Sequence, residues 1–385
     1  MRVLILSCNT GQGHNSTAAS IQEALAERGA VCDLRDALAF VARWLSRLVC
    51  AAHTFVYRHV PGLFRWGYAY TERHRGVFAP NSIVCKILSR SADRLSRFCR
   101  ENAYDVIICT HVFAGLIVTM MQEKYHLPLR AYSVETDYTC SPCAEQSKTE
   151  RYFIPAEHLV GEFIKCGIPK QRIVASGLPI HRGFFNHTDR QEAKSAMGIP
   201  ADHSHLILMC GSMGCGPMKA LVRLFNTSLK DHQDLTVICG TNRRLYRRLS
   251  RRYGANSRIH IRQYVQDISL LMDSADLYLT KPGGISVTEA AAKGLPMVFI
   301  DAVAGCEEYN MHYFIQRGAA VTARTPAALA SLCLSLLSDP ELLAQMSAAA
   351  KNASCGDGAK RISDLIWEDY LSGISPVQPC EPPEI

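Results

Sequence analysis

The chain has 385 residues, of which 48% are hydrophobic and 20% charged, and its formal net charge is +7. This balance excludes a disordered chain, and the length fits two domains of about 150–200 residues. Met1 and Arg2 lead directly into an apolar strand, so we expect no signal peptide. No apolar run reaches the ~18 residues that a membrane span needs. We therefore expect a cytoplasmic protein, free or attached to the membrane from the cytosolic side.

The first elements predict a βαβ unit. A strand over residues 3–8 is followed by a polar loop over 9–16, a helix from about 17 to 28 and a strand over 31–34. Ser16 occupies the third glycine position of the dinucleotide fingerprint, so that fingerprint is absent. His14 follows the strand's carboxyl end at a helix N-terminus, where the positive dipole keeps an imidazole neutral and able to accept a proton. The alternative is that His14 only caps the helix.

Residues 35–100 are basic and aromatic. Twelve basic and three acidic residues give this segment a net charge of +9, and Trp44 and Trp66 lie within it. Arg43 and Arg47 share one face of a predicted helix. Cations beside interfacial aromatic residues are typical of an anionic membrane surface. A solvated helix pair with core aromatics is the alternative, and nucleic acid is a weaker one because no recognition motif accompanies the charge.

The rest of the first half adds strands over residues 104–110, 129–134 and 152–155 and a helix over 156–167. Asp137 follows the second of these strands, and a carboxylate that caps the next turn is one interpretation of it. Cys140 and Cys143 form a CxxC pair without a second ligand pair, so we interpret them as incidental loop cysteines.

A polar connection over residues 180–204 leads to a second domain. Its first strand, 206–210, ends in a glycine-rich loop before a helix over 218–230, which suits phosphate. That loop contains Gly211, Ser212, Met213 and Gly214. A later helix carries six arginines without acidic partners. This face is either solvated or in contact with an anionic surface. Residues 326–352 read as helical, a final helix covers about 360–371, and 372–385 read as a flexible tail.

The most informative stretch is Thr280 to Asn310. A buried strand ends in the Gly283-Gly284 turn, a helix runs from about Ser286 to Lys293, and an apolar strand covers 297–300. Backbone N–H groups and the helix dipole make such a turn a phosphate site. Glu289 on the same helix would meet a ribose attached to that phosphate. Polar residues then follow the second strand, where ligands of open α/β sheets bind. They are Glu307, Glu308 and Asn310.

This stretch resembles the nucleotide-sugar motif of glycosyltransferase family 28. It is most similar to the branch of monogalactosyldiacylglycerol synthases and processive diacylglycerol glucosyltransferases, which reads K-P-G-G-(x)-T-(x)-x-E-A and then P-G-Q-E-E-G-N. Cys306 and Tyr309 depart from that pattern in the part that touches the sugar. The segment around His14 and the segments T-H-x-F, T-D and S-G-L-P-I resemble the family as well, so the resemblance covers roughly residues 1–375.

The resemblance implies an α/β protein of GT-B architecture, with two Rossmann-like domains facing across a cleft. We expect residues 1–180, with helix 360–371, to form an acceptor and lipid-binding domain and residues 205–357 to bind the UDP-sugar. The family places the catalytic base at His14 and the uracil-binding backbone at Tyr264-Val265, and Asp137 would hold the acceptor hydroxyl or steer His14. The two glycine turns would hold the diphosphate, Glu289 the ribose, and Glu307 and Glu308 the sugar, with Thr288 and Asn310 as further donor-binding residues. Gly13, Arg43, Trp44, Arg47 and Trp66 are the expected acceptor and membrane contacts.

The expected activity is inverting transfer of glucose or galactose from a UDP-sugar to diacylglycerol at the inner face of the cell membrane. No DxD motif occurs in the sequence, so we expect no metal and no other cofactor. The expected partners are the UDP-hexose, diacylglycerol and an anionic membrane surface, without nucleic acid. Two alternatives stay open: a UDP-sugar epimerase of the same architecture, and an inactive UDP-sugar or lipid sensor.

Overall fold

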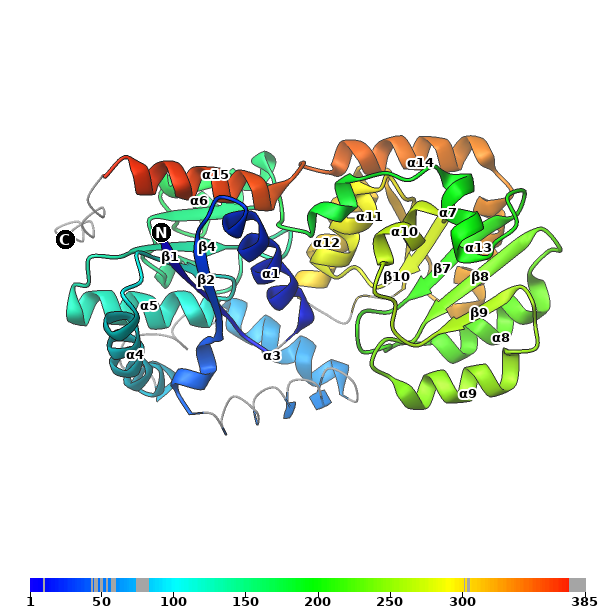
Figure 1. The fold of residues 1–385 in the computed structure, drawn as a ribbon. Helices are drawn as coiled ribbons and strands as arrows, with labels where there is room; N and C mark the ends of the chain where they lie inside the picture. The colour runs from blue at the N-terminus through cyan, green and yellow to red at the C-terminus, as the bar shows by residue number, and fades with distance from the viewer. Residues whose placement is uncertain are drawn as a thin grey trace. The chain divides into compact units, whose positions relative to one another are not determined.

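The computed structural model describes residues 1–9, 11–42, 44, 48, 51–52, 55–56, 60–73, 83–300, 302 and 305–373. The chain divides into two compact units, one of Met1–His181 with Asp357–Ile385 and the other of Arg182–Gly356. Figure 1 shows the elements of each unit. Arg43, Arg47 and the tail beyond residue 373, which carried predictions, lie outside the described residues.

A parallel six-stranded sheet forms the centre of unit 1, in the order β2-β1-β3-β4-β5-β6. Its strands are β1 Arg2–Ser7, β2 Val31–Asp36, β3 Val106–Cys109, β4 Arg130–Val134, β5 Arg151–Ile154 and β6 Ile173–Ala175. The central strands are runs of buried aliphatic residues, as expected of parallel strands covered on both faces. Chain order reverses between β1 and β3, which is the position where open α/β sheets bind ligands.

The sheet of unit 1 is covered by helices and short 3₁₀ turns. The helices are α1 Gln12–Ala26, α3 Pro61–Arg73, α4 Ile83–Asn102, α5 Val112–Tyr125, α6 Val160–Lys165 and α15 Gly358–Leu371. The turns are η1 Ala37–Phe40, η3 Ala144–Gln146, η4 Glu157–Leu159 and η5 Lys170–Arg172. The prediction that the first helix begins near residue 17 was wrong. The Asn15 side chain accepts from Ser7 Oγ at 2.6 Å and donates to Asn9 Oδ1 at 2.9 Å, which holds the chain in a helix from Gln12.

The last helix, α15, packs against α1 of the same unit. Its Asp369 carboxylate accepts two hydrogen bonds from the Arg151 guanidinium, at 2.8 and 2.6 Å. The Tyr132 hydroxyl donates to the same carboxylate at 3.0 Å. Ser363 Oγ also donates to the Ala24 carbonyl at 3.1 Å. These contacts join the end of the described chain to strands β4 and β5 and to α1.

Unit 2 repeats the plan with a parallel six-stranded sheet in the order β12-β11-β10-β7-β8-β9. Its strands are β7 Ser204–Met209, β8 Gln233–Ile238, β9 Ile259–Arg262, β10 Leu277–Thr280, β11 Met297–Phe299 and β12 Ala320–Thr322. Chain order reverses between β7 and β10, whose residues pair from Leu206 with Leu277 to Met209 with Thr280. The second ligand-binding position is therefore at the carboxyl ends of β7 and β10.

The helices of unit 2 cover its sheet on both faces (Figure 1). They are α7 Arg190–Met197, α8 Met218–Ser228, α9 Arg243–Tyr253, α10 Ile268–Asp273, α11 Gly284–Ala292, α12 Cys306–Gln316, α13 Pro326–Leu337 and α14 Pro340–Ala353. Residues 326–352, predicted to be helical, form the two helices α13 and α14, because Pro340 cannot continue α13 and instead starts α14. One prediction needs correction. Residues 182–204 belong to unit 2 and contain η6 Arg182–Phe185 and α7, whereas the sequence predicted a connection.

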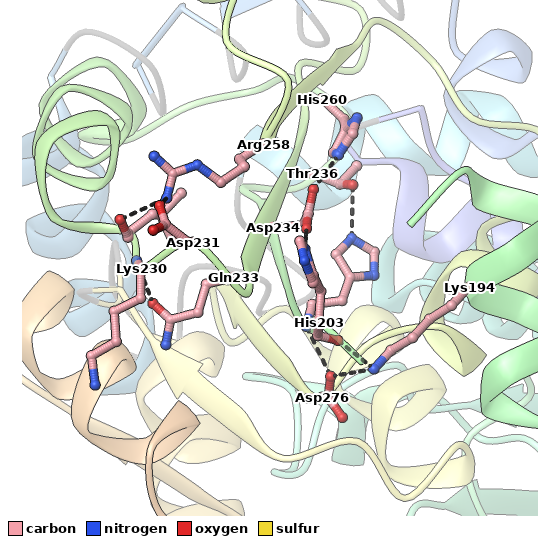
Figure 2. Close-up of polar contacts among 12 residues, drawn as sticks. Lys194, His203, Lys230, Asp231, Gln233, Asp234, Thr236, Arg258, His260 and Asp276 are labelled. Atoms are coloured by element: carbon pink, nitrogen blue, oxygen red, sulfur yellow. Dashed lines mark hydrogen bonds and ion pairs between the residues drawn. The ribbon is translucent and has the colours of Figure 1, made fainter. Parts of the chain in front are cut away.

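A buried polar network lies at the amino ends of β7, β8 and β9 (Figure 2). The Asp234 carboxylate receives His203 Nδ1 at 2.6 Å on one oxygen and His260 Nε2 at 2.7 Å on the other. The Lys194 ammonium lies 3.1 Å from the Asp276 carboxylate. The groups of this network are thus partnered with one another, at the edge of the sheet opposite the ligand-binding position.

No single helix among the described residues is long and apolar enough to cross a membrane. One bent pair of helices, residues 326–337 with 340–371, passes by length and composition only.

Candidate active site

Three adjacent strands of unit 1 bring their following residues to one edge of the sheet. His14 lies in the first turn of α1 after β1, Thr110 and His111 follow β3, and Thr136 and Asp137 follow β4. The carboxyl ends of β1, β3 and β4 meet at the point where chain order reverses. His14 and Asp137, two residues that the sequence proposed for one site, therefore lie in the same part of the fold.

Backbone contacts define the tautomer of His14. Its Nδ1 lies 2.8 Å from the Thr110 carbonyl oxygen, and a carbonyl can only accept. Nδ1 therefore carries a proton and donates, with Thr136 Oγ1 as a second neighbour at 3.1 Å. In the neutral ring, Nε2 is then the nitrogen without a proton. The arrangement leaves a proton acceptor at the strand edge.

The charge state of His14 follows from its surroundings. Burial lowers the pKa of His14, and the nearby Asp137 carboxylate and the bond to the Thr110 carbonyl oppose that shift. The imidazole is consequently neutral at pH 7, as the sequence suggested, although burial is the main cause and not the helix dipole. Asp137 acts on the ring through its charge and would stabilise an imidazolium once a proton had been accepted.

His111 is a neighbour that the sequence did not nominate for the site. Its ring lies edge-on to that of His14, with centroids 4.6 Å apart. The Phe113 N–H donates to His111 Nδ1 at 3.1 Å, so His111 caps α5 and its proton, when neutral, is on Nε2. Thr110 and Thr136 were missed as well. The sequence signal that could have found these residues is a polar pair directly after each of two apolar strands, Thr110-His111 after β3 and Glu135-Thr136 after β4.

The loop that carries Asp137 is held by two carboxylates, of which Glu135 is buried and Glu162 half-buried. Glu162 Oε1 accepts from Thr139 Oγ1 at 2.7 Å and from the Cys140 N–H at 2.8 Å. Ser141 Oγ donates to Glu135 Oε2 at 2.7 Å. Burial raises the pKa of Glu135 to about 7, so this carboxyl changes charge near neutral pH. The loop is therefore positioned by Glu162 of α6 and by Glu135, its own first residue.

In unit 2, two glycine-rich turns flank the point where chain order reverses. Residues 211–216 follow β7, and Gly283-Gly284 follows β10. A Cβ on Gly216 would lie 3.7 Å from Lys281 Cε, which shows that the two turns approach each other. The Asn242 amide also donates to the Gly214 carbonyl at 3.2 Å and so holds the first turn in place.

Left-handed backbone explains the glycines of the first turn. Gly214 has a φ of +55°. A Cβ there would lie 2.4 Å from the Cys239 carbonyl oxygen, closer than real atoms approach. Gly283 is different, because its φ is ordinary and a Cβ would meet nothing within 4 Å. Gly283 therefore faces open space at the N-terminus of α11.

Helix caps distinguish the three helices that follow β7, β10 and β11 from the other helices of unit 2. The N-termini of α8, α11 and α12 lack a side-chain cap. In contrast, α7, α9, α10, α13 and α14 are capped by Asp189, Asn242, Asp267, Thr325 and Asp339. Uncapped helix starts leave backbone N–H donors for other acceptors, and these donors suit an anion.

A buried cation lies beside the two turns. Lys281 is buried. Burial raises the pKa of the Cys210 thiol to about 12, and the positive charge of Lys281 opposes that rise. The sequence did not nominate Lys281, which stands one residue before the Pro-Gly-Gly turn. A cation and uncapped N–H groups together favour a diphosphate here.

The acidic residues proposed for sugar and ribose lie nearby in sequence and in fold. Glu307 and Glu308 are in the first turn of α12, and Asn310 Nδ2 donates to the Pro282 carbonyl at 3.0 Å. Burial raises the pKa of Glu289 to about 8, so its carboxyl is mostly protonated at pH 7. Thr288 is buried and its hydroxyl donates to the Gly284 carbonyl at 2.7 Å, within α11.

The remaining predicted residues lie on surfaces. Tyr264 is 71% exposed, and Val265 is half-buried, after strand β9. Trp44 and Trp66 are 67% and 64% exposed, which contradicts the alternative that these aromatics are core residues. Gly13 lies in the first turn of α1. Among the described residues, no group of three or more His, Cys, Asp or Glu is arranged to hold a metal ion.

Comparisons with known proteins agree with this architecture. The model of the monogalactosyldiacylglycerol (MGDG) synthase family matches residues 14–180, and that of glycosyl transferases group 1 matches residues 218–353. A processive diacylglycerol beta-glucosyltransferase of Bacillus cytotoxicus is 27% identical over 374 residues, which are 96% of this chain and 94% of the relative.

Solved structures share the fold at lower identity. MurG of Acinetobacter baumannii matches with a TM-score of 0.64 and 14% identity, over 96% of this chain and 99% of that chain. S. aureus MnaA, solved with UDP, matches with a TM-score of 0.64 and 14% identity, over 97% of each chain.

Two Rossmann-like domains with these neighbours define the GT-B class, which confirms the predicted fold. The chain is similar to monogalactosyldiacylglycerol synthases over residues 14–180 and to processive diacylglycerol beta-glucosyltransferases over most of its length. The resemblance seen in the sequence motifs is thereby confirmed.

Proposed function

We propose that this protein transfers a hexose from a UDP-sugar to the hydroxyl of diacylglycerol and forms a glycolipid. The observation that carries the proposal is His14, whose Nδ1 proton is committed to the Thr110 carbonyl and whose Nε2 is left to accept a proton. The relatives that are processive diacylglycerol beta-glucosyltransferases support this acceptor and favour glucose as the sugar.

The proposed chemistry is a single displacement. His14 Nε2 takes the proton of the lipid hydroxyl, and the oxygen attacks the anomeric carbon as the bond to UDP breaks. The sugar inverts, UDP leaves as an anion, and the imidazolium is stabilised by Asp137. General-base assistance of this kind is worth about 10²–10⁴-fold in rate.

We assign the donor to unit 2. The N–H groups around Gly211–Gly214 and Gly283-Gly284, with the Lys281 ammonium, would hold the diphosphate and stabilise the departing UDP without a metal. Glu289 would bind the ribose hydroxyls; in its protonated form it can donate as well as accept. Glu307, Glu308 and Asn310 would contact the sugar, Thr288 would support the turn, and Tyr264-Val265 would contact the uracil.

We assign the membrane contact to the segment around α3. Leu63, Trp66 and Tyr70 recur at helical spacing and are all exposed, and the Trp66 and Tyr70 rings stack with centroids 5.5 Å apart. Exposed aromatic residues on an amphipathic helix suit the interface of a bilayer. Trp44 is exposed as well. With diacylglycerol as the substrate, the protein would bind peripherally to the inner face of the cell membrane.

The test uses purified protein, vesicles containing diacylglycerol, and either UDP-glucose or UDP-galactose, with EDTA present. Glycolipid formed from one donor would establish transfer, the donor and independence from metal in one experiment. Conversion of the donor without a lipid product would favour an epimerase. Tight UDP binding without turnover of either donor would favour a sensor, and loss of activity in EDTA would contradict metal independence.

A further inference from the structure

Helix α9 presents an unusual surface on unit 2. Its sequence alternates pairs of arginines with pairs of other residues, and all six arginines are exposed. They are Arg243, Arg244, Arg247, Arg248, Arg251 and Arg252. At about 100° per residue, these positions span an arc of about 180°. Leu245, Leu249 and Tyr253 occupy the opposite side and are buried in the core of unit 2. The solvent side of α9, the arginine face, is therefore built of one residue type.

The arginine face has no acidic partners. Helix α9 contains no Asp or Glu, and among the described residues none of its six guanidinium groups forms an ion pair with a carboxylate. The arginines recur at i, i+3 and i, i+4 spacing, where like charges repel. Other exposed cations are neutralised within the fold, such as Lys124 by Asp93 at 2.7 Å. An anionic partner would relieve the repulsion that the chain itself leaves in place.

The arginine face is directly joined to the proposed donor site. Asn242 precedes Arg243 and caps α9 by accepting from the Leu245 N–H at 3.0 Å. The same side chain donates to the Gly214 carbonyl in the first glycine-rich turn. The Thr241 N–H donates to the Ser212 carbonyl in that turn at 2.8 Å. A surface that binds α9 would therefore fix the position of the turn.

We propose that the arginine face of α9 binds the phosphate headgroups of an anionic phospholipid bilayer. This inference rests on the proposed function, in which the acceptor is a bilayer lipid, and adds a second membrane contact, on unit 2. A helix on the outside of a domain presents a convex surface, which meets a layer of headgroups without a groove. The arc holds no aromatic side chain for stacking with bases, so a single-stranded nucleic acid is a poorer match.

The test compares two full-length variants in which four cations become Gln. The α9 variant is R247Q/R248Q/R251Q/R252Q, which keeps the two arginines beside the glycine-rich turn. The control variant is K165Q/K170Q/R324Q/K351Q, whose residues are exposed and lie on other elements. Both lower the formal net charge from +7 by four. Binding is measured by flotation with phosphatidylcholine vesicles that contain increasing phosphatidylglycerol, at low and high salt.

We expect the α9 variant to bind phosphatidylglycerol vesicles at least about tenfold more weakly than wild type, and the control variant to lose much less. Added salt should reduce wild-type binding toward that of the α9 variant. Equal losses in both variants would mean that net charge alone governs binding, and would overturn the proposal. Unchanged binding of the α9 variant would overturn it too. So would loss of oligonucleotide binding by the α9 variant with vesicle binding intact.

Transfer to diacylglycerol dispersed in a neutral detergent separates this inference from the proposed function. The α9 variant should retain wild-type KM for the UDP-sugar and wild-type turnover there. A raised KM would assign the arginine face to the anionic donor and overturn the proposal. If wild type itself transferred no sugar, the proposed function would fail, whereas the vesicle-binding result would stand by itself.

Discussion

The geometry around His14 predicts a graded loss of activity when its contacts are removed one by one. Thr136→Val deletes the hydroxyl 3.1 Å from Nδ1 but leaves the shorter bond to the Thr110 carbonyl. One hydrogen bond of this kind contributes about 0.5–1.5 kcal/mol, which corresponds to about twofold to tenfold in kcat. His14→Ala removes the base itself and should lower kcat by about 10²–10⁴-fold.

The same geometry fixes the sign of the pH dependence. Activity should fall only at a pH below the pKa of an ordinary histidine, because burial lowers the pKa of His14 and only the neutral ring accepts a proton. Asp137 raises that pKa, so Asp137→Asn should move the acid limb of the kcat profile further down. It should also lower kcat on the plateau, because the imidazolium loses its counter-charge.

The assay is initial rate against pH with saturating UDP-sugar and lipid, for wild type and the three variants. Circular dichroism would check that each variant is folded. A shift of the acid limb to higher pH in Asp137→Asn would refute the electrostatic reasoning. Full activity in His14→Ala would refute the assignment of the base.

Three further predictions concern stability and donor binding. Asp369→Ala should destabilise unit 1 by about 1–3 kcal/mol in a denaturant titration, because it leaves the half-buried Arg151 guanidinium without the carboxylate that joins α15 to the sheet. Gly240→Ala should weaken UDP binding at least about tenfold by calorimetry, because φ is +58° and a Cβ would lie 2.1 Å from the Ser212 carbonyl oxygen in the glycine-rich turn. The melting temperature of Glu289→Gln should rise relative to that of wild type as the pH increases toward 8, because wild type loses stability over this range. The folded pKa of about 8 lies above the unfolded value of 4.5, so the stability that protonated Glu289 contributes is lost over that range.

Much of the fold could be predicted because its signals are local. Glycine pairs between apolar strands and helices mark βαβ units, and the reversal points then follow from the general plan of such sheets. The sequence signal for the break between α13 and α14 was also local, because Asp339-Pro340 marks a helix start. Long runs of helix-forming residues on either side concealed it. The early start of α1 depends on side-chain contacts of Asn15 that composition alone does not reveal.

The site itself could be predicted only in part. His14 stood out because it lies at a helix N-terminus in a glycine-rich segment. Its partners are 96 and 122 residues away, so only the pairing of β1 with β3 and of β3 with β4 brings Thr110 and Thr136 to the ring. Lys281 was not nominated for the site, although it is the first residue of the K-P-G-G motif that the sequence shares with the family. It is buried because the two turns of unit 2 approach each other.

The two edges of the sheet in unit 2 differ in how their polar groups are satisfied. At the amino edge, Asp234 receives one histidine on each carboxylate oxygen, so these three side chains satisfy one another (Figure 2). At the carboxyl edge, the helices after β7, β10 and β11 begin without a side-chain cap. A fold that caps α9, α10, α13 and α14 with side chains has the means to cap these helices as well. Three helix starts without a side-chain cap beside a buried lysine therefore support the proposal that an anion binds at this edge.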